Sequence, residues 1–223
     1  MIADLRGLAR DAALDALAVL LPVECAGCGA DDRALCRECR CALAPRIRWH
    51  RLDDGLPVAA ALDYAGVARE VILAVKERGR TDAAGPLAAA LDAALEAVLE
   101  ALAGAEIVAV PTSRAARRRR GYDPVELLLR RAGRTRSRVF AARQERPVQK
   151  GLNREERMAA VRGSIHARRP LSGRRFVIVD DVLTTGATLM ETARAIRSAG
   201  GEAVAAAVVA ATPRNFPEDF RNA

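Results

Sequence analysis

Apolar residues along the chain alternate between short continuous runs and longer periodic segments. Residues 176–179 are all apolar, as expected of a strand that is buried on both faces of a parallel sheet. Further strands are predicted at 57–64, 105–110, 137–141 and 202–212, and helices at 67–79, 85–103, 127–131 and 189–200. Strands that alternate with helices are typical of an α/β protein with a parallel sheet flanked by helices.

The remaining segments are predicted from their composition. The first 22 residues contain an amphipathic helix, which either packs on the main domain or forms a partner interface. Residues 45–55 are interpreted as a connector, in which Trp49 and His50 form a surface or packing pair. The predicted division is therefore a helix at 1–22, a cysteine-rich segment at 23–44, the α/β domain at 56–212 and a tail at 213–223.

The chemical signal is strongest between residues 174 and 201. The apolar run is followed by Asp180 and Asp181, then by the small residues of 184–188, and then by a helix. Loop N–H groups and a helix N-terminus bind phosphate, and small residues let the backbone approach it closely. The two carboxylates can accept hydrogen bonds from ribose hydroxyls or hold hydrated Mg2+. The stretch predicts a sugar-phosphate site; the alternative is an ordinary strand–turn–helix unit, and a Walker A loop is excluded because no Gly-Lys-Ser/Thr follows.

Two Cys-x-x-Cys pairs lie near the N-terminus. Cys25 and Cys28 are separated from Cys36 and Cys39 by seven residues. Two intervening residues let both thiolates of a pair reach one ion, so the pairs predict a tetrahedral structural Zn2+ site, a ribbon or knuckle. Disulfides and a redox role are the alternatives. Cys41 has a poor spacing for this site and is interpreted as a bystander.

Positive charge is concentrated in one part of the chain. The sequence has 36 basic and 28 acidic residues, and residues 111–175 alone hold 20 basic and 5 acidic ones. This segment predicts a polyanionic partner, which would be pyrophosphate, a nucleotide or a nucleic-acid backbone. No apolar run approaches the roughly 18–20 residues that a membrane span needs, and the N-terminus does not resemble a signal peptide. We therefore expect a soluble cytoplasmic protein without membrane insertion.

Only two of the basic residues are lysines. Lys76 lies on the predicted helix 67–79, where a solvated surface charge is the favoured interpretation and a requirement for a compact point charge is the alternative. Lys150 lies in a charged segment, predicted to be a loop that turns into a polar helix beside the sheet and acts as a lid. The lid residues are Lys150, Arg154 and Arg157.

The whole chain resembles the ComF family of competence-associated proteins, which are similar to type I phosphoribosyltransferases. The final motif is shared with all type I phosphoribosyltransferases, whereas the zinc segment and the Arg-Gly-aromatic motif point to ComF. The matching features cover roughly residues 14 to 212 and are LLPVECAGCG, the spaced Tyr64, Gly66, Lys76 and Gly79, VPTSR…RRRGYDP, VQKGLNREER and VIVDDVLTTGAT.

The resemblance implies phosphoribosyl pyrophosphate (PRPP), or a related ribose phosphate, bound with Mg2+. Asp180 and Asp181 would hold the ribose hydroxyls and act as the catalytic pair. The 5′-phosphate would lie on Leu183, Thr184, Thr185, Gly186, Ala187 and Thr188, and the pyrophosphate on Thr112, Ser113, Arg114, Arg119, Arg120 and Gly121. Family members are linked to DNA uptake, where they handle incoming single strands with other competence proteins.

Two positions depart from the family pattern. Asp123 and Pro124 replace the usual Asn-Gln, and Ala160 replaces an Asn. A carboxylate beside the pyrophosphate adds repulsion, so binding is better supported than turnover. His166 is not assigned as a general base.

Three functional hypotheses remain. The first is a phosphoribosyltransferase of unknown acceptor. The second is a non-catalytic module that handles single-stranded DNA, although the chain is poor in aromatic residues that stack on bases. The third is a protein that binds PRPP as a regulatory ligand.

Overall fold

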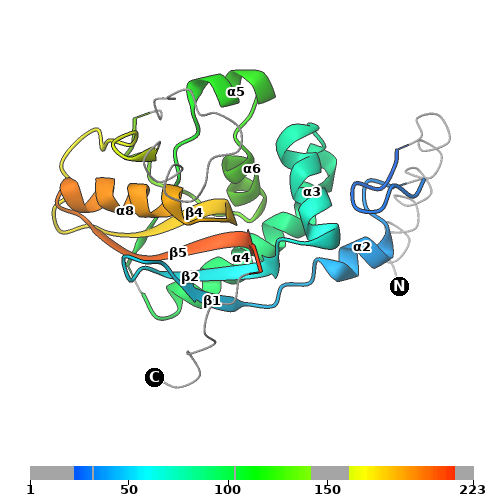
Figure 1. Cartoon of the computed structure of the whole chain (residues 1–223), viewed down its shortest axis with the longest axis horizontal. Helices are drawn as coiled ribbons and strands as arrows, with labels where there is room; N and C mark the ends of the chain where they lie inside the picture. The colour runs from blue at the N-terminus through cyan, green and yellow to red at the C-terminus, as the bar shows by residue number, and fades with distance from the viewer. Residues whose placement is uncertain (1–22, 32, 103, 142–160, 214–223) are drawn as a thin grey trace, which may run out of the picture.

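The computed structural model describes residues 23–31, 33–102, 104–141 and 161–213, and it confirms the predicted α/β class. One five-stranded sheet has the strand order β1-β2-β5-β4-β3 (Figure 1). Strands β2 (Pro57–Asp63), β5 (Glu202–Ala211), β4 (Arg175–Leu183) and β3 (Glu106–Ala109) are parallel, and β1 (Arg48–Arg51) pairs antiparallel with β2. The described helices are α2 (Arg37–Ala42), α3 (Gly66–Glu77), α4 (Ala84–Leu99), α5 (Arg114–Arg120), α6 (Pro124–Arg131) and α8 (Ala187–Ser198), with a 3-10 turn at Thr81–Ala83.

Two layers of apolar side chains cover the sheet. Val177 and Val179 belong to a core formed with α3, α4 and α6, whereas Phe176 and Ile178 belong to a core formed with α8. This alternation follows from the two-residue period of a strand, and it explains why the run 176–179 is continuously apolar. The carboxyl ends of β2, β4 and β5 point toward α3 (Figure 1).

The cysteine-rich segment packs on the domain. Leu35 and Leu43 belong to the same core as α3 and α4. A guanidinium nitrogen of Arg80, which follows α3, donates to the carbonyl of Glu24 at 2.9 Å. The segment is therefore held against the side of α3 (Figure 1).

Three element predictions need correction. Strand β4 does not end before the acidic pair but continues to Leu183, because Asp180 and Leu183 remain paired with Val208 and Ala211 of β5. The supposed connector 45–55 contains β1, an exposed edge strand whose charged sequence has no apolar run to reveal it. The strand expected at 137–141 is reduced to one bridge between Phe140 and Ala167.

Several predictions fall outside the described residues. These are the N-terminal helix within 1–22, the lid residues Lys150, Arg154 and Arg157, and the tail beyond 213. Among the helices that the structure describes, none combines the length and the hydrophobicity that a membrane crossing requires.

Candidate functional site

The acidic pair lies inside the end of β4. Asp181 is 8% exposed, and its backbone N–H donates to Oδ1 of Asp180 at 2.9 Å. Asp180 is paired with Val208 of the neighbouring strand, so the ladder fixes the backbone of both residues. The positions of the two carboxylates are therefore set by the sheet rather than by a loop.

Lys76 is the partner of this pair, contrary to the favoured interpretation of a solvated surface charge. Its Nζ lies 2.6 Å from Oδ2 of Asp181, at the last turn of α3. Burial acts to lower the pKa of Lys76, but the charges of Asp181 and Asp180 outweigh it and raise that pKa above the usual value. The rarity of lysine in an arginine-rich chain was the sequence signal for this contact.

Asp180 has an unusual protonation equilibrium. Burial, and next the negative charge of Asp181, raise the pKa of Asp180 to about 7, although Lys76 opposes the shift. Two carboxylates with one ammonium leave an excess of negative charge in a poorly solvated place, which a divalent cation with oxygen ligands would offset. The pair therefore fits a magnesium ion in its charge and donor type.

The short turn after β4 contains half of the residues that the sequence predicts for the 5′-phosphate. Gly186 has a φ of +78°, a left-handed backbone conformation that favours glycine, and a Cβ there would lie 2.7 Å from Cδ2 of Leu52, which would have to shift. Gly186 is the N-cap residue of α8 and offers no side chain to the first helical N–H groups. Thr212 ties the turn to β5, since its N–H donates to the carbonyl of Leu183 at 2.9 Å. The N–H of Ala187, the first residue of α8, donates to Oγ1 of Thr185 at 3.3 Å. N–H groups at a helix N-terminus are donors of the kind that binds phosphate.

Leu183 differs from the other residues predicted for the 5′-phosphate. Its side chain is 3% exposed and belongs to the core shared with α8. Only its backbone is placed beside the turn. The residues of the turn itself, 184–186, and the start of α8 are brought together next to the acidic pair.

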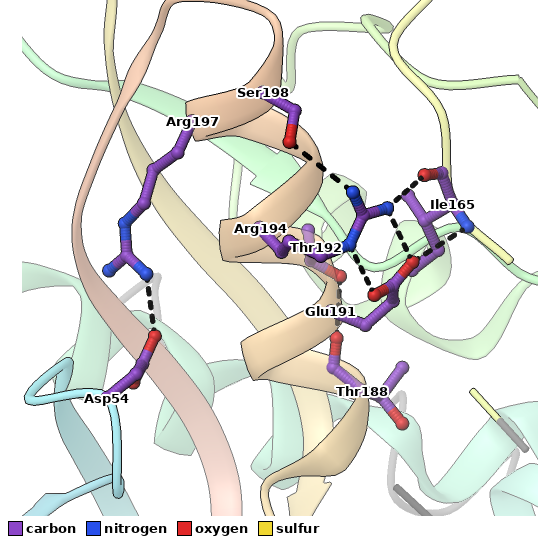
Figure 2. Close-up of polar contacts among 8 residues, drawn as sticks. All are labelled: Asp54, Ile165, Thr188, Glu191, Thr192, Arg194, Arg197 and Ser198. Carbon is purple, nitrogen blue, oxygen red and sulfur yellow. Dashed lines mark hydrogen bonds and ion pairs between the residues drawn. The ribbon is translucent and has the colours of Figure 1, made fainter. Parts of the chain in front are cut away.

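Helix α8 also anchors the segment 161–168. Glu191 is buried and accepts hydrogen bonds from Arg194 at 2.7 Å and 2.8 Å and from the backbone N–H of Ile165 at 3.3 Å (Figure 2). At the other side of α8, Arg197 pairs with Asp54 at 2.8 Å (Figure 2). These contacts were not predicted, because Glu191 lies in sequence like any polar residue of an amphipathic helix. The contacts of Glu191 hold α8 against Ile165, and the ion pair of Arg197 holds it against the loop that contains Asp54.

The arginine run forms the short helix α5, which buries no residue. Arg120 lies 2.7 Å and Arg119 3.6 Å from the carboxylate of Glu77, the last residue of α3. The Tyr122 hydroxyl donates to the carbonyl of Val75 in the same turn. Part of the run predicted for pyrophosphate is therefore held beside the acidic pair by α3, through contacts that sequence reasoning missed.

The other members of the predicted pyrophosphate site occupy different places. Ser113 caps α5, accepting a hydrogen bond from Ala116 N–H at 3.0 Å. Thr112 and Arg114 line a cavity of about 630 Å³, together with Arg117, Arg136, Arg138, Phe140 and Arg168. Neither Asp180 nor Asp181 lines this cavity. The structure thus divides the predicted residues between the acidic strand end and an arginine-rich hollow beside it.

Asp123 has a structural role in this region. Its carboxylate accepts a hydrogen bond from the N–H of Glu126 at 3.2 Å and caps α6, and Pro124 occupies the first turn. Asp followed by Pro is a recognisable helix start, so this role was readable from the sequence. The departure from the family pattern therefore replaces an amide by a helix cap, and the charge of Asp123 also helps to raise the pKa of Asp180.

Much of the positive segment is neutralised within the molecule. Arg134 pairs with Asp92 and Glu96 of α4, and Arg136 and Arg138 both pair with Glu126. Within the described part of the chain, the exposed Arg114, Arg117 and Arg118 of α5 have no ion pair. Arg130 and Arg131 of α6 are likewise exposed and without an ion pair among the described residues, so α5 provides one of the groups of charge available to an outside polyanion.

The four predicted zinc ligands form one cluster. The sulfur atoms of Cys25, Cys28, Cys36 and Cys39 all lie within 4.8 Å of one another, a set that could hold a zinc ion. Cys41 is exposed on α2 and lies outside the cluster. All four thiols come from residues 25–39, and Cys25 and Cys39 are also buried in the core that contains α3 and α4.

The local backbone favours a thiolate at Cys25, whereas burial and the neighbouring thiols raise the pKa of Cys39. Burial acts to raise the pKa of Cys25, but backbone N–H groups of Cys36, Cys28 and Gly27 outweigh it and lower that pKa to about 6. Thiolates are the metal-binding form of cysteine. Gly27 is required by packing, since a Cβ there would lie 2.7 Å from Sγ of Cys39.

Together, the mostly parallel sheet and the helices on both of its faces define the class of the protein, an α/β protein with an acidic strand end and a glycine turn before α8. The family model described as "Phosphoribosyl transferase domain" matches residues 63–219. The chain belongs to this family.

Three curated relatives illustrate the similarity. The transcriptional regulator GfcR of Methanocella arvoryzae is 56% identical over 39 residues, 18% of this chain and 19% of the relative. Orotate phosphoribosyltransferase of Xylella fastidiosa is 40% identical over 67 residues, 30% of this chain and 31% of that enzyme. Adenine phosphoribosyltransferase of Mycobacteroides abscessus is 56% identical over 39 residues, 18% of this chain and 22% of the relative. The chain thus spans less than a third of the length of each relative.

Proposed function

We propose that the chain binds PRPP, or a related ribose phosphate, with Mg2+ and acts as a phosphoribosyltransferase of the ComF type. The observation that carries the proposal is that the acidic pair of β4, the turn at Gly186 and the N-terminus of α8 follow one another directly along the chain. It provides acceptors for ribose hydroxyls and donors for a phosphate next to each other. The acceptors are the two side-chain carboxylates and the donors are backbone N–H groups, and both lie at the end of β4 or directly after it.

The residues have distinct roles in phosphoribosyl transfer. The bond from ribose C1 to a pyrophosphate oxygen breaks while C1 forms a bond to the acceptor, and positive charge develops on the ribosyl group. Asp180 and Asp181 accept hydrogen bonds from the ribose hydroxyls and orient the ring. Arg119 and Arg120 stabilise the negative charge that develops on the leaving pyrophosphate. Bound Mg2+ supplies further neutralisation of the diphosphate and fits the two carboxylates of the acidic pair.

The cysteine cluster is proposed to hold one structural zinc ion. Zinc thiolate sites with four cysteine ligands are closed, with no open coordination position for chemistry. The proposed zinc therefore stabilises the segment 23–44 against α3 rather than taking part in transfer.

Thermal stability measures the proposed ligand directly. PRPP with Mg2+ is expected to raise the melting temperature of the protein at millimolar ligand, since a ligand that binds only the folded state stabilises it. Ribose 5-phosphate, nucleotides and single-stranded oligonucleotides serve as comparisons. No stabilisation by PRPP or ribose 5-phosphate would reject the proposal.

A second candidate function is the binding of single-stranded DNA, which the ComF resemblance connects with DNA uptake in the cytoplasm and with other competence proteins as partners. It is favoured by the exposed arginines Arg114, Arg117 and Arg118 on α5. Substitution of Arg117 and Arg118 by Ala should weaken binding for all sequences and make its salt dependence shallower. Arg130 and Arg131, on α6, provide the matched control pair. An unchanged salt slope for the α5 variant would exclude α5 as the DNA-binding surface.

A further inference from the structure

Two consecutive charged residues at the end of α3, Lys76 and Glu77, contact the two parts of the proposed site, the acidic pair and the arginines of α5. The ammonium of Lys76 lies 2.6 Å from Asp181. The carboxylate of Glu77 lies 2.7 Å from Arg120 and 3.6 Å from Arg119. The end of α3 therefore places the ammonium of Lys76 against Asp181, which is proposed to bind the ribose and its metal. It also places the carboxylate of Glu77 against Arg119 and Arg120, which are proposed to bind pyrophosphate.

These contacts are held by the fold. The side chain of Arg120 is 13% exposed and that of Asp181 is 12% exposed, so both partners are fixed in poorly solvated places. Tyr122 donates to the carbonyl of Val75 and joins α3 to the residues that follow α5. Helix α3 is therefore linked to the strand end through Lys76 and to the residues around α5 through Glu77 and Tyr122.

The charges of the helix end match those of the proposed ligand. An ammonium beside a carboxylate takes the electrostatic place of a metal cation, and a carboxylate beside two guanidiniums takes the place of a phosphate group. A ligand that needs these groups must compete with charges that are tethered within the chain. Such an internal partner acts at a high effective concentration.

We propose that Lys76 and Glu77 are internal competitors for the two halves of the site: Lys76 competes with the metal at Asp181, and Glu77 competes with the diphosphate at Arg119 and Arg120. This inference rests on the proposed function, and it adds the residues that lower the affinity for each part of the ligand. A ligand with the diol and a 5′-phosphate alone displaces Lys76 but leaves Glu77 on the arginines. A ligand that carries the diol, the 5′-phosphate and a diphosphate displaces Lys76 from Asp181 and Glu77 from the arginines. Its diphosphate then pairs with Arg119 and Arg120.

Isothermal titration of the full chain with magnesium pyrophosphate, PRPP and ribose 5-phosphate tests this role. Glu77→Gln is expected to tighten the binding of pyrophosphate and PRPP about three- to fivefold, because a partly exposed ion pair has to be broken in the parent but not in the variant. The affinity for ribose 5-phosphate should not change. Glu70→Gln is the matched control, since Glu70 lies on α3 and pairs with Arg69 and Arg78 instead of the site.

The outcomes separate this inference from the proposed function. If the parent binds PRPP and Glu77→Gln leaves its affinities unchanged or weaker, the competitor role is wrong and the proposed function stands. If Glu77→Gln tightens only pyrophosphate and no variant binds PRPP, the competition at the arginines is supported and the proposed function fails. Equal tightening for ribose 5-phosphate, or in Glu70→Gln, would show a general charge effect and overturn the inference. A melting curve of each variant checks that the fold persists.

Lys76→Gln tests the other contact. Removal of the ammonium is expected to lower the Mg2+ concentration for half-maximal PRPP binding about threefold, because Asp181 no longer has an internal cation to exchange. An unchanged or higher magnesium requirement would overturn the role of Lys76 as a competitor.

Discussion

The cysteine cluster and the site at the end of β4 are assembled from different distances along the chain. All four clustered thiols lie between residues 25 and 39, and they face one another within 4.8 Å. The other site joins β4 and the turn before α8 to Lys76 of α3, and places α5 beside them through Glu77. The first depends on local spacing, and the second depends on a sheet that brings distant segments together.

This difference predicts how each site fails. Loss of the proposed metal removes the main reason for the cysteine segment to hold its shape, whereas the acidic pair is part of a strand whose neighbours are buried. Helix α3 lies between the two, since it contacts α2 and also carries Lys76. Substitutions that eliminate one function and leave the other measure how independent the two sites are.

The largest expected effect is the loss of bound zinc when one cysteine of the cluster is replaced. Cys36→Ser should reduce zinc from about one per chain to none and destabilise the segment 23–44, because three thiolates no longer close the tetrahedral site. PRPP binding should persist. Metal analysis of protein purified under reducing conditions gives the result, and Cys41→Ser, on the same helix but outside the cluster, should retain zinc. Zinc-free parent protein would contradict the metal assignment, and loss of PRPP binding in Cys36→Ser would show coupling through α3.

The corresponding substitution at the site after β4 is Thr185→Glu. A carboxylate in the phosphate-binding turn should abolish PRPP binding by repulsion and by filling the space, while zinc content stays unchanged. Titration calorimetry measures the ligand and metal analysis the zinc. Thr135→Glu, at an exposed position after α6, is the control for the added charge. Retained PRPP binding in Thr185→Glu would place the phosphate elsewhere.

A smaller effect is expected when one charge of the acidic pair is removed. Asp181→Asn and Asp180→Asn should each weaken PRPP binding about tenfold or more, since a charge-assisted hydrogen bond contributes roughly 1.5–3 kcal/mol. Asp63→Asn is the matched control, because Asp63 ends the parallel strand β2 and pairs with Arg48 at 3.3 Å. Equal losses in the control and in the site variants would argue against a specific role for the pair.

The smallest expected effect is a change in the pH dependence of the melting temperature. The pKa of Asp180 is raised to about 7, so between about pH 4 and pH 7 the folded state holds a proton that the unfolded state releases. This contribution to stability is therefore lost as the pH rises through about 7. In the absence of Mg2+, Asp180→Asn should melt ~2–4 °C above the parent at pH 8, with the difference narrowing toward pH 5. A constant difference at all pH values would mean that Asp180 is not the titrating group.

The sequence alone determined those features that depend on residues close together in the chain. The run 176–179, the acidic pair and the small residues after it predicted a strand that leads through a turn into a helix, because period and spacing are local properties. The two Cys-x-x-Cys pairs predicted a metal cluster for the same reason. Even the capping of α6 by Asp123 was encoded in an Asp-Pro pair.

Only the tertiary structure decided which charges meet. Lys76 lies more than a hundred residues before Asp181, and Glu77 has no feature in the sequence that distinguishes it from a surface acid. Their partners follow from the placement of α3 at the carboxyl ends of the strands (Figure 1). Likewise, the excess of positive charge at 111–175 could be counted from the sequence, but the acidic residues that neutralise much of it come mostly from other segments. Coulomb interactions depend on distance in space, and a linear pattern does not contain that distance.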